Sequence, residues 1–226
     1  MFFPDDTNRS RIILTTRKNV DDYVDSSRQA HEMHLLNKFQ SWNLLREKVF
    51  GKENCPPTLV EIGEEIANSC RGLPLAIDVI GGLLRKDKVS KDFWKQVAND
   101  VSSAIPEKDE KFSEILSLSY NYLPCYLKPC FLYVGALPED CEIRASRLLR
   151  GLKSIGGDKS FEEAGAKYFY ALVDRNLLLV RQHKSNGKVK RYGIHDIFSD
   201  LCVRKAGREK FLYVESLQAR NVPKNS

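Results

Sequence analysis

The last third of the chain carries the pattern that most restricts its fold. Two runs typical of β-strands, residues 177–180 and 189–194, flank Asn186-Gly187, which is the strongest short signal for a β-hairpin. Helical periodicity precedes the first run over residues 160–173 and follows the second over residues 195–205. The order helix, strand, hairpin, strand, helix predicts a winged-helix domain.

Residues 55–120 have the pattern of a small bundle of four amphipathic helices. Thr58 and Glu61 have the spacing of a capping box, in which the two residues satisfy each other's backbone donors. Gly72 then breaks the first helix and Pro74 starts the second, since proline fits the first turn of a helix and glycine fits its end.

The first 54 residues resemble α/β material instead. Residues 10–17 predict a buried strand of a parallel sheet, and residues 33–36 predict a second, short strand. Residues 41–50 predict a helix that Gly51 ends. These strands are too few for a sheet of their own, so the pattern implies further α/β sequence upstream.

The chain is therefore expected to be mainly α-helical, with a partial α/β segment, a helical bundle and a winged helix. Within the winged-helix segment, residues 124–136 and 143–149 predict two more helices. The predicted limits are 1–54 for the α/β segment, 55–120 for the bundle, 121–215 for the winged-helix domain and 216–226 for a tail.

Composition excludes several classes of function. The net charge is +6, from 36 basic and 30 acidic residues, which is a weak indication of nucleic-acid binding. The six cysteines show neither C-x-x-C spacing nor a Cys/His metal pattern, and no segment resembles a signal peptide or a membrane span. We therefore expect a cytoplasmic protein with no membrane contact.

One local charge cluster stands out, and we interpret it as a solvated hairpin face. It consists of Arg181, Lys184, Lys188, Lys190 and Arg191.

Four segments in one order resemble a known family. They are residues 10–17 (Ser-Arg-Ile-Ile-Leu-Thr-Thr-Arg), residues 70–76 (Cys-Arg-Gly-Leu-Pro-Leu-Ala), residues 116–124 running into 127–133 and 137–140, and residues 192–196 (Tyr-Gly-Ile-His-Asp). Together they resemble the NB-ARC module of plant nucleotide-binding, leucine-rich-repeat receptors. The third segment is most similar to the coiled-coil class, particularly the late-blight-resistance-like receptors of nightshade relatives.

The resemblance implies a switch that ADP holds closed and that exchange for ATP opens, after which the receptors oligomerise and trigger defence. It implies that Arg17 senses the terminal phosphate, that Pro74 and Leu75 cover the adenine, and that His195 contacts the ADP β-phosphate. From the residues alone, the favoured interpretations are that Arg17 is a surface arginine and that Pro74 is only a helix start, while His195 can be a boundary residue.

Four further residues are expected to act mechanically. By resemblance, Gly72 shapes the adenine loop, and Asp196 orients its turn and holds the closed state; from the residues alone Asp196 is a helix N-cap. Tyr120 and Phe131 are most simply core residues, and in the family their segment packs the helical bundle against the winged helix.

The phosphate-binding motif G-x-x-x-x-G-K-[ST] does not occur in the 226 residues, nor does the acidic strand that would hold Mg²⁺. The α/β segment is then the remnant of a P-loop NTPase domain. We expect ADP or ATP to bind weakly or not at all to this chain alone, with Mg²⁺ bound only in the full-length module. We expect no enzyme activity from what would be a fragment of a weak STAND-type ATPase.

Three functional hypotheses stay open. The first is a regulatory switch segment whose partners are other NB-ARC receptor chains or an N-terminal half that supplies the phosphate loop. The second is an interaction or decoy fragment that binds no nucleotide. The third is a DNA-binding winged-helix protein, which is disfavoured because Phe198, Leu201 and Val203 suggest that much of the last helix is buried.

Overall fold

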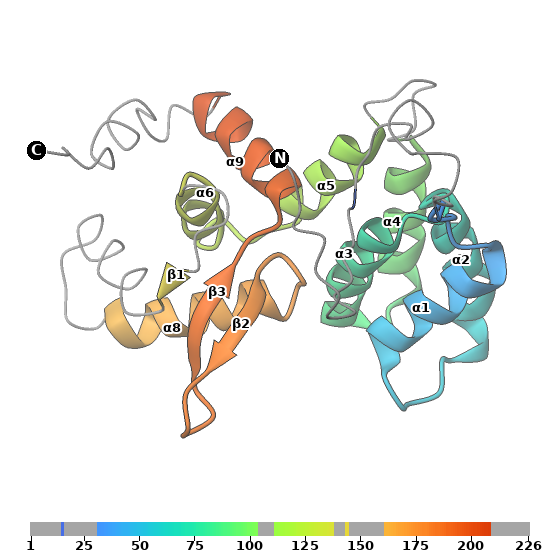
Figure 1. Ribbon diagram of the computed structural model, residues 1–226. Helices are drawn as coiled ribbons and strands as arrows, with labels where there is room; N and C mark the ends of the chain where they lie inside the picture. Colours follow the sequence, from blue (N-terminus) through green and yellow to red (C-terminus); the bar gives the residue numbers. More distant parts are fainter. Residues whose placement is uncertain (1–14, 16–30, 104–110, 138–142, 145–160, 209–226) are drawn as a thin grey trace, which may run out of the picture. The chain divides into compact units, whose positions relative to one another are not determined.

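The computed structural model describes residues 15, 31–103, 111–137, 143–144 and 161–208 (Figure 1). The chain divides into two units, residues 1–34 and 35–226. In the first unit the described residues are exposed and lack regular structure. The strand predicted at 10–17 therefore lies outside the described residues, apart from Thr15.

The segment predicted as a second strand, residues 33–36, forms no strand and has no regular structure. Its structural role is to lead into a capped helix. The Asn37 side chain accepts a hydrogen bond from the Gln40 backbone N–H (2.9 Å), and the Gln40 side chain accepts one from the Asn37 N–H (3.0 Å). This reciprocal pair satisfies two donors that a helix start leaves free, so the helix begins at Lys38.

The helical bundle consists of α1 (Lys38–Phe50), α2 (Pro57–Ser69), α3 (Pro74–Leu84), the short 3₁₀ helix η1 (Arg85–Asp87), α4 (Lys91–Ser103) and α5 (Lys111–Asn121). Gly51 ends α1 as predicted, with φ of 60° and its N–H bonded to the Glu47 carbonyl. The predicted capping box at Thr58 is wrong. Pro57 already occupies the first position of α2, which begins without any side-chain cap.

One hydrophobic core, here called the bundle cluster, holds these helices together. Its largest buried side chain is Trp94, whose ring stacks on Phe50 of α1 at 5.8 Å between centroids. The other buried members are Leu45, Val49, Leu59, Ile66, Ala67, Cys70, Ala76, Ile77, Ile80, Leu83, Leu84, Val97, Ala98, Val101 and Ile115. The helix that the sequence grouped with the α/β segment, α1, therefore packs in the core of the bundle.

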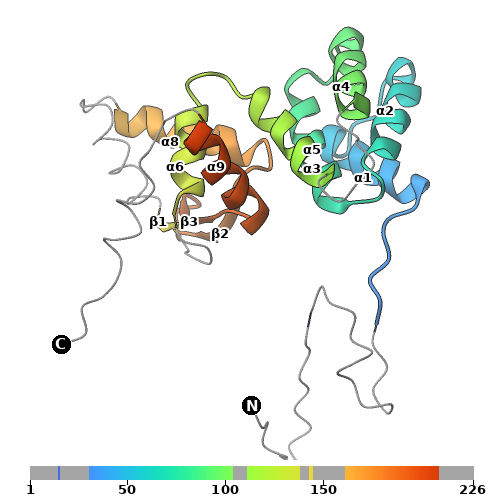
Figure 2. The same ribbon diagram turned by 90° about the horizontal axis from the view of Figure 1, so that it is seen from above.

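The remaining elements have the predicted winged-helix order (Figure 2). They are α6 (Lys128–Gly135), β1 (Ile143–Arg144), α8 (Phe161–Val173), β2 (Leu179–His183), β3 (Val189–Gly193) and α9 (Asp196–Arg208). Among the described residues the strands form an antiparallel sheet in the order β1-β3-β2. The hairpin turn forms at Gly187, whose φ is 76°.

Two of the helix predictions in this part need correction. The helix predicted at 124–136 begins only at Lys128, since residues 125–127 form a turn. The helix predicted at 143–149 is wrong at its first two residues, because Ile143 and Arg144 pair with Tyr192 and Arg191 as a strand. Residues 145–149 lie outside the described residues.

A second core, here called the winged-helix cluster, fills this part of the chain. Its buried members are Val79, Leu116, Tyr120, Leu123, Leu127, Cys130, Phe131, Leu132, Val134, Phe169, Leu172, Leu177, Leu178, Val189, Tyr192, Phe198, Leu201, Cys202 and Ala206. Within it, α6 and α9 pack on each other and are also joined by a hydrogen bond from the buried Ser199 hydroxyl to the Gly135 carbonyl (2.7 Å).

Three of the described cysteines, Cys70, Cys130 and Cys202, are buried as small apolar residues, whereas Cys125 is exposed. Cys70 and Cys130 are buried, and burial raises the pKa of their thiols to about 12 and about 11 respectively. The described residues contain no cluster of potential metal ligands. None of the described helices is long and apolar enough to cross a membrane.

Gly72 offers a direct test of the tight turn between α2 and α3. Its φ is 73°, and a Cβ there would lie 2.2 Å from the Leu36 carbonyl oxygen. Gly72→Ala should therefore lower the free energy of unfolding by about 1–3 kcal/mol, measured by urea denaturation. Gly207→Ala, where a Cβ meets no atom within 4 Å, is the control and should be neutral or slightly stabilising. Equal stabilities of the two variants would contradict the conclusion that the turn requires a glycine at position 72.

Candidate functional site

The predicted adenine loop is a compact turn that leads into α3. Pro74 is the first residue of α3 and is exposed, whereas Leu75 is half-buried and packs against the winged-helix cluster. Gly72 is buried, and its carbonyl accepts a hydrogen bond from the Leu36 N–H at 3.0 Å. The turn therefore fixes the start of α3 and leaves the proline ring accessible to a ligand. Arg17, the predicted phosphate sensor, lies outside the described residues.

His195 stands between β3 and α9. Its carbonyl accepts hydrogen bonds from the N–H groups of Phe198 (2.8 Å) and Ser199 (3.2 Å), which closes the first turn of α9. Its Nδ1 atom is buried and lies 2.5 Å from Oδ1 of Asp196, an ion-pair distance without hydrogen-bond geometry. The imidazole as a whole is 43% exposed. With Nδ1 beside the carboxylate, Nε2 is the ring nitrogen available to a ligand.

Asp196 is the first residue of α9 and lies in its first turn, with 54% of its side chain exposed. It therefore does not occupy the position before the helix that an N-cap takes. A carboxylate in the first turn is stabilised by the positive end of the helix dipole. This placement fits the predicted role in orienting the turn.

The two predicted mechanical residues lie in contact. The rings of Tyr120 on α5 and Phe131 on α6 are 6.1 Å apart between centroids, and Phe131 meets Phe198 of α9 edge-on at 5.7 Å. The Tyr120 ring also lies 5.2 Å from the ammonium groups of both Lys128 and Lys205, a cation–π geometry. Tyr120 therefore joins α5 to α6 and α9.

Two helices, α3 and α5, contribute to both hydrophobic cores. On α5, Ile115 belongs to the bundle cluster and the next residue, Leu116, to the winged-helix cluster. On α3, Ile77 and Ile80 face the bundle cluster, whereas Val79 is a buried member of the winged-helix cluster. Each helix thus uses two faces at helical spacing, and α3 and α5 also pack on each other.

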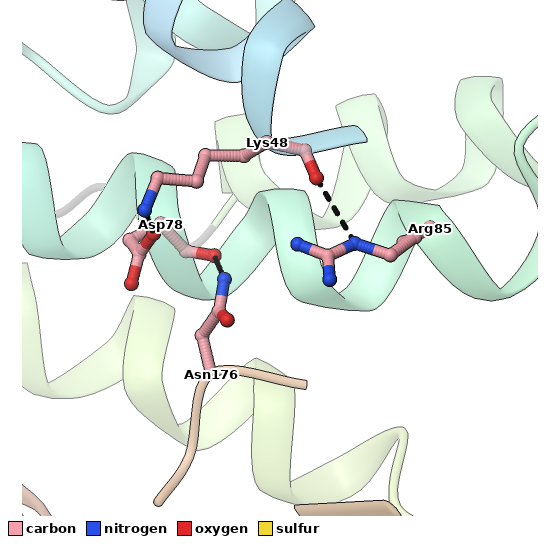
Figure 3. Close-up of polar contacts among 4 residues, drawn as sticks. All are labelled: Lys48, Asp78, Arg85 and Asn176. Carbon is pink, nitrogen blue, oxygen red and sulfur yellow. Dashed lines mark hydrogen bonds and ion pairs between the residues drawn. The ribbon is translucent and has the colours of Figure 1, made fainter. Parts of the chain in front are cut away.

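Polar contacts also connect α3 to both of its neighbouring parts of the chain (Figure 3). The Asn176 side-chain amide, from the turn after α8, donates to the Asp78 carbonyl at 2.8 Å. The Asp78 carboxylate forms an ion pair with Lys48 of α1 at 2.5 Å, and Arg85 Nε donates to the Lys48 carbonyl at 3.0 Å. We call these four residues the α3 joint, because they link α1, α3 and the turn before β2.

The backbone itself approaches closely at the joint. Gly82 of α3 lies against Arg175, so that a Cβ at Gly82 would be 2.4 Å from the Arg175 carbonyl oxygen. Asn176 has φ of 57°, the left-handed region that few residues other than glycine and asparagine adopt. A glycine on α3 and an asparagine in the turn therefore allow this approach with little strain.

Positive charge gathers beside the joint, at the carboxyl end of α3. Burial is the first cause that lowers the pKa of Lys86, and the neighbouring Arg175 is the second. Burial also lowers the pKa of Arg175, whose guanidinium donates to the Ala171 carbonyl at 3.2 Å. Cations just after the last turn of α3, such as Lys86, are favoured by the negative end of the helix dipole.

The α3 joint was not predicted from the sequence. The available signals were the pair Gly81-Gly82 inside a helix, which lowers helix propensity without ending the helix, and Asn176 just before a strand. Neither signal identifies its partner, and Asn176 and Asp78 lie 98 residues apart in the chain.

Asn176 can be tested with variants that separate its two contributions. Asn176→Gly keeps the left-handed backbone and removes the amide donor, so it should cost about 0.5–1.5 kcal/mol of unfolding free energy. Asn176→Ala should cost roughly 1–2 kcal/mol more, because alanine also disfavours this φ. Asn99→Ala, on the exposed face of α4, is the control and should have little effect in the same denaturation assay. Wild-type stability of Asn176→Gly would show that the hydrogen bond contributes nothing.

Comparison with known families matches two parts of the chain. The profile of the NB-ARC domain matches residues 1–55, and that of the disease resistance protein winged helix domain matches residues 137–202. The second match covers most of the strands and helices that form the winged-helix cluster. NB-ARC domains bind nucleotide in general and form a family of STAND-type ATPases.

Individual relatives extend the similarity along almost the whole chain. A putative late blight resistance protein homolog and late blight resistance protein R1-A, both from Solanum demissum, are 41% and 40% identical over 218 residues. In each case 93% of this chain is covered, but only 17% of the relative. The chain therefore carries part of an NB-ARC domain followed by a winged-helix domain of the plant disease-resistance type, homologous to one segment of the late blight resistance proteins.

Proposed function

We propose that this chain is a nucleotide-dependent switch segment of a plant intracellular immune receptor and acts in disease resistance. The names of its relatives support the biological setting, and the NB-ARC match supports the nucleotide. The described cysteines are free thiols, which suits action in the reducing cytoplasm. The segment regulates and is not an enzyme on its own.

The observation that carries this proposal is the double role of α3. Its first residues, Pro74 and Leu75, form the predicted adenine contact, and Val79 further along the same helix is buried in the winged-helix cluster. Ile194, which precedes His195, packs against that cluster as well. A nucleotide that contacts both Pro74 and His195 would add a second link between α3 and the winged-helix cluster, which already pack on each other.

Such a ligand stabilises one arrangement only if it binds that arrangement more tightly than the other. ADP would favour the arrangement in which α3 is seated in both clusters. ATP, with its additional phosphate, would favour one in which the winged helix has left α3. The switch then needs no catalytic group among these residues.

The grip on the phosphates must come from elsewhere, since the 226 residues contain no P-loop motif. We propose that another NB-ARC chain or the N-terminal half of the module supplies it, together with Mg²⁺. Without that partner we expect ADP to bind weakly and ATP not to be hydrolysed.

Calorimetric titration of the chain with ADP and ATP tests the assignment. We expect weak binding of ADP that His195→Ala abolishes and that His183→Ala, at an exposed histidine on the hairpin, leaves unchanged. Binding that persists in His195→Ala would contradict the proposed phosphate contact. A folded wild-type chain that binds neither nucleotide would support the interaction fragment instead.

A further inference from the structure

All of the excess positive charge of the chain lies in one short segment. Residues 175–195 contain 6 Lys and Arg residues and no Asp or Glu, which accounts for the whole net charge of +6. The remainder of the chain holds 30 basic residues (36 minus 6) and 30 acidic residues, so it is balanced. Five of the six cations lie within residues 181–191, on β2, β3 and the turn between them, here called the basic wing.

The basic wing is exposed and held in a fixed shape. Every residue from 181 to 188 is exposed, as is Lys190, while Val189 and Tyr192 anchor β3 in the winged-helix cluster. The turn is closed by a hydrogen bond from the Lys184 N–H to the Lys188 carbonyl at 2.8 Å. In Figure 1 this turn extends away from α9. Arg181, Lys184, Lys188 and Lys190 are therefore presented to solvent by this hairpin, whereas Arg191 is only partly exposed.

The Arg181 side chain lies close to the backbone of the neighbouring strand. A Cβ on Gly193 would lie 2.8 Å from Arg181 Nε, so the arginine side chain lies directly across the glycine. Arg181 is exposed and lies on the same hairpin as the lysines. Its planar guanidinium offers several hydrogen-bond donors whose geometry suits phosphate oxygens.

The chemistry of the wing selects its partner. The turn, residues 184–188, has no apolar side chain that could enter a lipid bilayer. The exposed wing also lacks the aromatic and aliphatic side chains that form the centre of protein–protein interfaces. A phosphate backbone needs only cations and hydrogen-bond donors, which the lysines, Arg181 and the polar residues Gln182 and Asn186 supply.

We propose that the basic wing binds the phosphate backbone of nucleic acid without reading its sequence. Phe198 and Leu201 of α9 are buried in the winged-helix cluster, so that face of the helix does not reach base edges. Val203, which was expected to be buried with them, is instead exposed. This function is separate from the nucleotide switch. It uses the exposed side of β2 and β3, whereas the predicted nucleotide contacts lie at the starts of α3 and α9.

The test is fluorescence anisotropy of the full chain with a labelled duplex DNA of mixed sequence, about 20 base pairs long, over a series of KCl concentrations. The wing variant Lys184→Gln/Lys188→Gln/Lys190→Gln is compared with Lys52→Gln/Lys91→Gln/Lys95→Gln, which removes three exposed lysines from the bundle side. Both variants lower the net charge from +6 to +3, by the three lysines removed from the wild-type sum.

We expect the wing variant to bind about tenfold or more weakly at ~0.1 M salt. Its slope of log affinity against log salt should fall by roughly 2–3, since each phosphate contact contributes about 0.9. The bundle variant should keep most of the wild-type affinity and slope, and His195→Ala should bind DNA like the wild type. That last result would separate the wing from the nucleotide site.

The proposal would be overturned by absence of DNA binding by the wild type, by an equal loss in both lysine variants, or by binding that does not depend on salt. Vesicles rich in phosphatidylserine form a second arm, and tighter wing-dependent binding to them than to DNA would also overturn it. A single-stranded RNA of the same length forms a third arm. Wing-dependent binding of either nucleic acid supports the backbone contact, and their relative affinities identify the preferred source of phosphate.

Discussion

The arrangement of this chain depends on one helix that is buried on two sides. α3 gives Ile77 and Ile80 to the bundle cluster and Val79 to the winged-helix cluster, and Gly82 brings its backbone against the turn at Arg175. Moving α3 away from either cluster exposes apolar surface, at about 25 cal/mol for each square ångström. Packed interfaces of this kind do not deform gradually, so the proposed switch would have two states, with the winged helix either packed on α3 or separated from it.

The polar groups at the α3 joint set orientation more than stability. Lys48 and Asp78 are partly exposed, with side-chain accessibilities of 37% and 23%, and ion pairs of that exposure contribute little. The hydrogen bond from Asn176 is more selective, because it requires the left-handed turn, the Asp78 carbonyl and the seated helix together. If the winged-helix cluster separated from α3, the Asn176 hydrogen bond and the apolar contacts would be lost together. Such simultaneous loss is what a two-state element requires.

Local signals in the sequence predicted the elements whose stability is local. Asn186-Gly187 specified the hairpin, and Gly51 and Pro74 marked a helix end and a helix start. The errors arose where a distant partner decides the outcome. Ile143 and Arg144 become a strand only because β3 pairs with them. The α3 joint was missed for the same reason, since Gly82 and Asn176 acquire meaning only from backbone that lies far away in the chain.

The candidate site also has a part that the sequence predicts and a part that it does not. Motif positions identified Pro74 and His195 as residues at helix starts, and the structure places both there. What they bind is a matter of chemistry that helix starts alone do not determine, since an exposed proline and a half-exposed imidazole fit several ligands. The physical content of the nucleotide proposal therefore lies in the connection through α3, and not in the two residues taken separately.

Strand β3 connects the two proposed binding surfaces of the winged helix. Its first part carries Lys190 of the basic wing, and its end leads through Ile194 into His195. A polyanion bound to the basic wing and a nucleotide bound at His195 would therefore contact opposite ends of the same strand. If the two ligands favour different positions of β3, each must change the affinity of the other by the same factor. Val189 and Tyr192 fix β3 in the winged-helix cluster. Such coupling would therefore act through the packing of that cluster against α3, and it would change the contacts of the α3 joint.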